Sequence, residues 1–141
     1  MIYRHEILKG RDKTAPLDDQ QEKNLEILLE RLNRFRADWG KPITISSGYR
    51  TEEINAKAHG SKKSWHLLCA AADLYDPDRA LAKHFMNNQG LLLIYDFWME
   101  HPAWTMTWVH LQIYPPSSGT RVFRPYLGEP PTDFYWPKSI S

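Results

Sequence analysis

One charged residue inside an apolar segment limits most strongly how this chain can fold. The segment from Leu67 to Leu74 is apolar apart from Asp73. A carboxylate in a buried segment costs several kcal/mol of folding free energy unless it is paired or binds a metal ion. Partners for Asp73 must therefore come from elsewhere in the sequence.

Two histidines in similar surroundings are candidate partners. His66 directly precedes the apolar segment, and His110 lies in a strand-like pattern that begins at Trp108. Alternation along that strand places Trp108, His110 and Gln112 on one face. Two imidazoles and a carboxylate can hold zinc, with a fourth position open for water. The same three residues can also be hydrogen-bonded groups of a core, and their spacing alone does not decide between the two.

Length and charge exclude several other classes of protein. The chain has 141 residues, with 18 Lys and Arg against 17 Asp and Glu, and a formal net charge of +1. This size is typical of a single domain, residues 1–141, and the charge excludes nucleic-acid binding through bulk positive charge. No apolar run reaches the roughly 20 residues of a membrane helix. The first residues lack a signal-peptide pattern, which predicts synthesis in the cytoplasm. We expect a monomer without membrane insertion.

Hydrophobic periodicity predicts one long helix after an irregular N-terminal arm, residues 1–17. Asp18 and Gln21 form a capping-box pattern, and apolar side chains follow at helical spacing at positions 25, 28, 29, 32 and 35. The predicted helix covers residues 18–38 and ends before Gly40.

The rest of the chain alternates short helices and strands. We expect helices from Thr51 to about Ala58 and from Asp76 to about Gly90, and strands over Ile43–Ser46, Leu91–Tyr95 and Trp108–Tyr114. Residues 115–141 are rich in proline and aromatic residues and are predicted to wrap over the domain as an extended C-terminal segment. Helices combined with a few strands that can pair antiparallel define an α+β protein.

Several short motifs occur together in one order. They are Ser47-Gly48-Tyr49-Arg50-Thr51, Asn55, Gly60-Ser61, Ser64-Trp65-His66, Ala71, Asp73 and Trp108-Val109-His110. In this order and spacing, residues from about 20 to 114 resemble the zinc D-Ala-D-Ala carboxypeptidases of the peptidase M15 family. The family pattern is Ser-x-His-x-x-Gly-x-Ala-x-Asp, followed by a strand with a final His. The resemblance implies the Hedgehog/DD-peptidase fold, in which helices pack on one face of a small antiparallel sheet.

The resemblance also implies a role for each matching residue. His66, Asp73 and His110 would be the ligands of one catalytic zinc ion. Arg50 would bind the terminal carboxylate of the substrate, which suits its planar guanidinium; the alternative is a surface salt bridge. Ser64 would hydrogen-bond the substrate or its own loop; the alternative is a hydroxyl that only caps a turn.

The chain departs from the family where the general base is expected. Relatives often carry an acid three residues before the last histidine, and this chain has Thr107 there, which cannot act as a base at neutral pH. Glu100 is the nearest acid in the same segment and is our candidate for the general base; the alternative is a solvated loop carboxylate. Gln112 could instead orient water or substrate without accepting a proton.

Two further features allow alternative interpretations. Cys69 replaces the glycine of the family pattern, either as a small buried hydrophobe or as a fourth zinc ligand that would close the site. Aromatic residues near the C-terminus either line a substrate groove or anchor the C-terminal segment, and the second use is favoured for those in the tail. These residues are Trp98, Trp104, Tyr114, Tyr126 and Trp136.

The resemblance implies a hydrolase, a zinc metallopeptidase that cleaves the stem peptides of peptidoglycan as a carboxypeptidase or an endopeptidase. Zinc would polarise the scissile carbonyl and lower the pKa of water. The small size and the start of the chain are similar to phage-encoded members, which include cell-wall-degrading endolysins; such a protein would move from the host cytoplasm to the cell wall, or belong to the virion. The alternative, motivated by Thr107 and Cys69, is a structural or interaction module that keeps the zinc and has lost the reaction.

Overall fold

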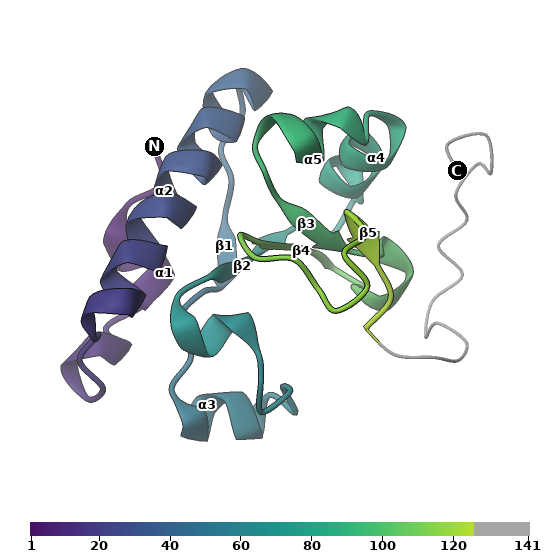
Figure 1. Cartoon of the computed structure of the whole chain (residues 1–141). Helices are drawn as coiled ribbons and strands as arrows, with labels where there is room; N and C mark the ends of the chain where they lie inside the picture. Colours follow the sequence, from purple (N-terminus) through teal and green to yellow (C-terminus); the bar gives the residue numbers. More distant parts are fainter. Residues whose placement is uncertain (126–141) are drawn as a thin grey trace.

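A computed structural model describes residues 1–125 of the chain, so the residues predicted as the end of the C-terminal segment, with Tyr126 and Trp136, lie outside the described part. At its centre is a five-stranded sheet with the order β1-β2-β4-β3-β5 (Figure 1). The strands are β1 (Ile45–Ser47), β2 (Ala71–Tyr75), β3 (Trp98–Glu100), β4 (Trp108–Gln112) and β5 (Val122–Phe123). The pair β3–β5 is parallel and the other pairs are antiparallel, so the sheet is mixed and the α+β class is confirmed.

The long helix is formed as its sequence pattern predicts. Helix α2 (Asp19–Trp39) begins after Asp18, whose carboxylate accepts the backbone N–H of Gln21 at 2.7 Å. The Gln21 side chain accepts the N–H of Asp18 in return, which completes the capping box. At the other end, Gly40 adopts the left-handed conformation (φ 73°) that a helix C-cap commonly needs.

The N-terminal arm is helical in part, so the expectation of an irregular segment over residues 1–17 is only partly right. It forms α1 (Arg4–Leu8) and a single 3₁₀ turn, Arg11–Lys13. Five residues are too few to show a helical period, and α1 is stabilised by burying Ile7 and Leu8 in the core.

The segment Leu91–Tyr95 is also not the strand that we expected. Residues Gly90–Ile94 form helix α5, and the nearby strand β3 begins only at Trp98. A short apolar run fits a buried strand and a buried helix equally well, which explains the error.

The preceding helix, α4 (Ala80–Asn87), starts later than predicted. The carboxylate of Asp76 accepts the N–H groups of Leu81 and Ala82, both at 2.9 Å, and so caps α4 from outside it. Three short helical elements complete the described chain: α3 (Glu52–Lys57), capped by Thr51 as expected, and the 3₁₀ helices η2 (Trp65–Leu68) and η3 (Pro102–Trp104).

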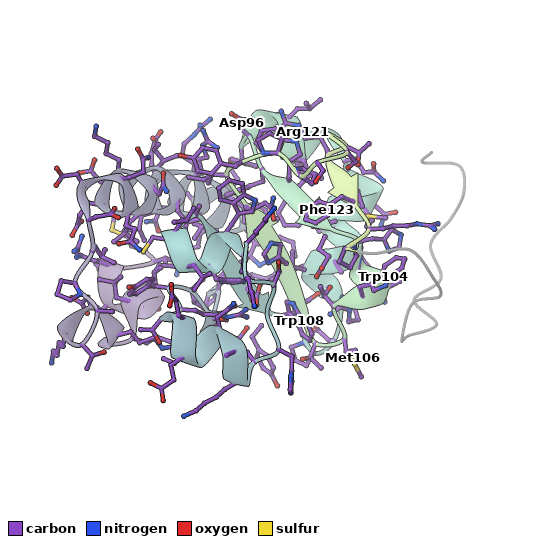
Figure 2. The ribbon with its side chains drawn as sticks, turned by 60° about the horizontal axis from the view of Figure 1, so that its bottom comes forward. Asp96, Trp104, Met106, Trp108, Arg121 and Phe123 are labelled. Atoms are coloured by element: carbon purple, nitrogen blue, oxygen red, sulfur yellow. The ribbon has the colours of Figure 1, made fainter. Side chains whose placement is uncertain are left out.

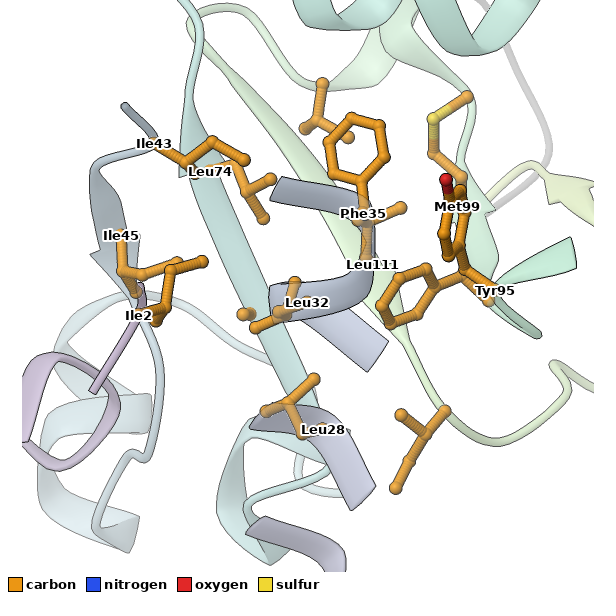
Figure 3. Close-up of a cluster of buried hydrophobic side chains, with 14 of the residues drawn as sticks. Ile2, Leu28, Leu32, Phe35, Ile43, Ile45, Leu74, Tyr95, Met99 and Leu111 are labelled. Carbon is orange, nitrogen blue, oxygen red and sulfur yellow. The ribbon is translucent and has the colours of Figure 1, made fainter. Parts of the chain in front are cut away.

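One hydrophobic core lies between α2 and one face of the sheet (Figure 3). Leu28, Leu32 and Phe35 of α2 pack there with Leu74 of β2 and Leu111 of β4. Helices α1, α4 and α5 add residues to the same cluster, so these helices lie on one face, as the resemblance implies. Within residues 1–125, none of the helices combines the length and the apolar character that a membrane span needs.

Candidate metal centre

The three predicted zinc ligands lie together on the other face of the sheet. Asp73 of β2 is paired with His110 of β4, and His66 reaches them from η2. The carboxylate oxygen Oδ1 of Asp73 is 3.2 Å from Nε2 of His66 and 2.9 Å from Nδ1 of His110. One ligand atom from each residue lies within 4.8 Å of the other two. The sequence prediction of the cluster therefore agrees with the geometry.

A neighbouring carbonyl sets the orientation of the His66 ring. Nδ1 of His66 is 2.8 Å from the carbonyl oxygen of Gly48, which can only accept, so Nδ1 carries the hydrogen. In the neutral ring, the lone pair is then on Nε2, which faces Asp73. The position of Gly48 next to the backbone of Ile7 explains its identity, because an added Cβ would overlap the Ile7 carbonyl oxygen.

The side chain of Gln112 sets the orientation of the His110 ring. Its side-chain nitrogen donates to the carbonyl of Tyr114 at 2.8 Å, so its oxygen Oε1 is left to accept from Nε2 of His110, also at 2.8 Å. The neutral His110 ring therefore has its lone pair on Nδ1, facing Asp73. Two imidazole lone pairs and one carboxylate thus converge, and this donor set with hydrogen-bonded outer nitrogens fits a zinc ion.

The surroundings tune the protonation of the three ligands. Burial acts to raise the pKa of Asp73, but the charges of His66 and His110 and their hydrogen bonds outweigh it and hold the pKa well below its usual range. Burial lowers the pKa of His66, which favours its neutral form. Burial acts likewise on His110, yet the hydrogen bond and charge of Asp73 and the charge of Glu100 raise its pKa. A bound cation would take the place of the proton on His110.

The local conformation of the chain delivers His66 to the site. Ser64 caps η2 by accepting the N–H of His66 at 3.2 Å, which is the turn-capping role considered for it, and it also lines the cleft described below. After η2, Cys69 has a left-handed backbone (φ 56°), the conformation that glycine adopts most easily, and this accounts for the glycine of the family pattern.

Cys69 itself behaves as a small buried hydrophobe. Its side chain is fully buried, and burial raises the pKa of the thiol to about 12. The charged groups that act on it are Glu22, Arg4, Asp18 and Asp12, from the N-terminal part of the chain. Among the described residues, the group that could hold a metal ion consists of His66, Asp73 and His110 and does not include Cys69.

Arg50 is tied into the cluster more closely than the sequence suggests. Its guanidinium donates to Ser47 Oγ at 3.1 Å, to Asn55 Oδ1 at 3.3 Å and to Asp73 Oδ2 at 3.4 Å. Its side chain is only 15% exposed, so this ion pair is half-buried and is not the surface salt bridge considered as an alternative. These bonds use three of the five guanidinium N–H groups, and Arg50 also lines the cleft described below.

Asn55 and Gly60, two motif residues without an assigned role, support Arg50. The amide of Asn55 donates to the carbonyl of Ser61 at 2.8 Å while its oxygen accepts from Arg50. A Cβ at position 60 would overlap the amide of Asn55, so a larger residue there would displace the side chain that accepts from Arg50. Their place in the motif signalled importance, but not this contact.

Glu100 lies in strand β3 and not in a loop. It is the residue after the Met99–Leu111 pair of β3 and β4, which places it beside His110, and it lines the same cleft. It is half-buried, so the alternative of a solvated loop carboxylate is wrong. Burial raises its pKa, against the opposing charge of His110.

A cleft with a volume of about 1070 Å³ opens over the cluster. Its wall includes four aromatic residues, Trp65, Trp104, Trp108 and Phe123, of which Figure 2 labels the last three. Trp104 therefore lines the groove. Trp98 does not; the guanidinium carbon of Arg121 lies 3.9 Å from the centre of the Trp98 ring. Tyr114 stacks on Trp65 of η2, with ring centroids 4.7 Å apart.

Helices cover one face of the sheet, and a His-Asp-His cluster that could hold a metal ion lies in a cleft on the other face, so the chain has the layout of a protein with a candidate metal site. The chain belongs to the peptidase M15 family, because the sequence model described as Peptidase M15 matches residues 3–90. This range includes His66 and Asp73 and stops before Glu100 and His110. No curated protein matches the chain.

Proposed function

We propose that this protein is a zinc-dependent peptidase that hydrolyses the stem peptides of peptidoglycan. The observation that carries the proposal is the convergence of two imidazole lone pairs and the Asp73 carboxylate in an open cleft, next to a further carboxylate, Glu100. Membership of a peptidase family supports the same reaction class. When bound to this cluster, zinc would supply a Lewis acid that polarises the scissile carbonyl and lowers the pKa of water.

Glu100 acts as the general base in this proposal. It takes the proton of the attacking water and gives it to the leaving amine nitrogen. Its half-buried position on the strand beside His110 holds the carboxylate in the cleft, and its raised pKa favours return of the proton.

The other polar residues of the cleft hold the substrate. The two remaining N–H groups of Arg50 bind the terminal carboxylate of the peptide, and the hydroxyl of Ser64 hydrogen-bonds its backbone. Gln112 acts through His110, by fixing the ring, and so supports the metal more than the water. The protein acts as a monomer on the peptide, without nucleic acid or insertion into a membrane.

A second candidate function is a zinc-binding structural or interaction module of the same fold, for example a phage virion protein. The observation in its favour is that Thr107 occupies the position of the expected acid. In the structure, the backbone carbonyl of Thr107 accepts the N–H of Asp76. The presence of Glu100 in the cleft favours the enzyme. A phage origin, with action as an endolysin on the cell wall, is part of the proposal and predicts lysis or virion genes beside the coding gene.

Mass spectrometry of the products from purified peptidoglycan and its stem peptides tests the proposal. Zinc-loaded wild-type protein should release new fragments, and the His66→Ala variant should release none. Glu100→Gln should bind one zinc ion per chain but cleave at least a hundredfold more slowly, since a general base contributes about 10²–10⁴-fold. A zinc-loaded wild type that cleaves nothing would leave the module as the better candidate.

A further inference from the structure

A single row of side chains crosses the sheet under the cleft. Strand pairing sets Ser47 of β1 against Asp73 of β2, and Asp73 against His110 of β4. On the far side, Glu100 of β3 pairs with Phe123 of β5. Since Glu100 lies beside His110, the row runs from Ser47 at one edge to Phe123 at the other. The ring of Phe123 stands edge-on to His110, with centroids 6.3 Å apart.

Each end of this row carries an arginine that lines the cleft. Arg50 lies at the β1 end, hydrogen-bonded to Ser47 and Asp73. Arg124 directly follows Phe123 at the β5 end, and its guanidinium carbon is 5.6 Å from the ring centre of Trp104. The metal cluster and Glu100 lie between the two cations in the order of the strands.

The two arginines differ in how far the protein satisfies them. Arg50 gives three of its N–H groups to other side chains. Arg124 is exposed and lies over the ring of Trp104, and its charge also acts on His101; no ion pair between Arg124 and a carboxylate is found among residues 1–125. A guanidinium that lies over an aromatic ring keeps its charge and its in-plane N–H groups available for a carboxylate.

We propose that Arg124 binds a second carboxylate of the substrate, on the side of the metal centre opposite to Arg50. The protein would then select peptides that carry a carboxylate on each side of the cleaved bond. This inference rests on the proposed function, because it adds a specificity-determining residue to the same cleft. Phe123 separates Glu100 from this carboxylate position and limits the repulsion between the two anions.

The spacing of the strands sets the place of this second carboxylate. Adjacent strands lie about 4.8 Å apart, so β5 is about 10 Å from β4 across β3. An extended peptide advances about 3.3 Å per residue, so the carboxylate lies about three residues from the cleaved bond. In a stem pentapeptide that ends in D-Ala-D-Ala, the free α-carboxylate of the γ-linked D-Glu has this separation from the last bond.

Two pentapeptides that differ only in this group test the inference: L-Ala-γ-D-Glu-L-Lys-D-Ala-D-Ala and its analogue with D-isoglutamine in place of D-Glu. The zinc-loaded wild type should show a kcat/KM about tenfold higher for the D-Glu peptide. Arg124→Gln should reduce this ratio to about one by raising KM for the D-Glu peptide alone, and Arg124→Lys should restore part of it. Lys23→Gln, the same charge loss at an exposed position on α2, should keep the wild-type ratio.

Calorimetric Kd values of both peptides with zinc-free protein give a readout that does not depend on cleavage. Cleavage with an unchanged ratio in Arg124→Gln would overturn the inference and leave the peptidase intact. If the D-Glu peptide binds with the lower Kd, if Arg124→Gln abolishes this difference, and if neither peptide is cleaved, the inference is supported and the proposed peptidase reaction is wrong. Neither binding nor cleavage would overturn both.

Discussion

At the scale of single residues, the site depends on groups that do not touch the metal position. The carbonyl of Gly48 and the side chain of Gln112 each accept one imidazole N–H, and they thereby decide which nitrogen of His66 and of His110 is free. Without them, either ring could turn its N–H toward Asp73 and compete with a cation. The donor set is therefore preorganised by hydrogen bonds behind the ligands.

Replacing Gln112 by leucine tests this role. The variant removes the acceptor of the His110 Nε2–H group and leaves all three ligands in place. The affinity for zinc should fall by about tenfold to a hundredfold, since this is the usual cost of losing such a partner. Competition with a chromophoric chelator measures the affinity. Gln20→Leu, on the exposed side of α2, is the control, and an equal loss there would contradict the prediction.

The sequence predicts the candidate metal ligands better than the residues that hold them in place. His66, Asp73 and His110 follow from the motif and from the cost of burying Asp73, and both are local features. The hydrogen bond from Arg50 to Asp73 joins residues 23 positions apart and depends on the pairing of β1 with β2, which no local pattern encodes. The strand position of Glu100 has the same origin, because β3 lies between β4 and the distant β5.

At the scale of elements, length decides which predictions succeed. Helix α2 has 21 residues, a capping box and several turns of apolar spacing, so its limits agree with the prediction within one residue. Helices α1 and α5 have five residues each, which is less than two turns, and their identity is set by contacts made after the chain has folded.

The packing of α1 against the loop after β1 can be tested at Gly48. A Cβ there would overlap the carbonyl oxygen of Ile7 and lie 2.8 Å from its Cα, so α1 must move. Gly48→Ala should lower the free energy of unfolding by about 1–3 kcal/mol, as overpacking usually does. It should also weaken zinc binding, because the same residue orients His66. Urea denaturation measures the first effect.

Gly90→Ala is the matched control for this substitution. No atom lies within 4 Å of an added Cβ at position 90, which is the first residue of α5, so this variant should be as stable as the wild type or slightly more stable. Equal losses at positions 48 and 90 would show that close packing of α1 is not the cause.

At the scale of the whole molecule, one face of the sheet packs in the hydrophobic core and the other face carries the candidate site. Val109 and Leu111 of β4 belong to the core, while Trp108, His110 and Gln112, which alternate with them, line the cleft. Successive side chains of β4 therefore point alternately into the core and into the cleft, as the sequence predicts. The cluster joins β2, β4 and η2, so a bound cation would connect segments that come from distant parts of the chain.

Because the three candidate ligands come together only in the folded chain, zinc should stabilise the protein. At a free zinc concentration 100 times the Kd, the free energy of unfolding should rise by about 2.7 kcal/mol, which is roughly 5–10 °C in Tm for a chain of this size. Thermal denaturation with zinc and after chelation measures the shift. Magnesium, which prefers oxygen ligands, should give a much smaller one. In His110→Ala, which lacks a ligand, zinc should give little shift; a shift equal to that of the wild type would mean that zinc binds elsewhere and that the His66-Asp73-His110 cluster is not its site.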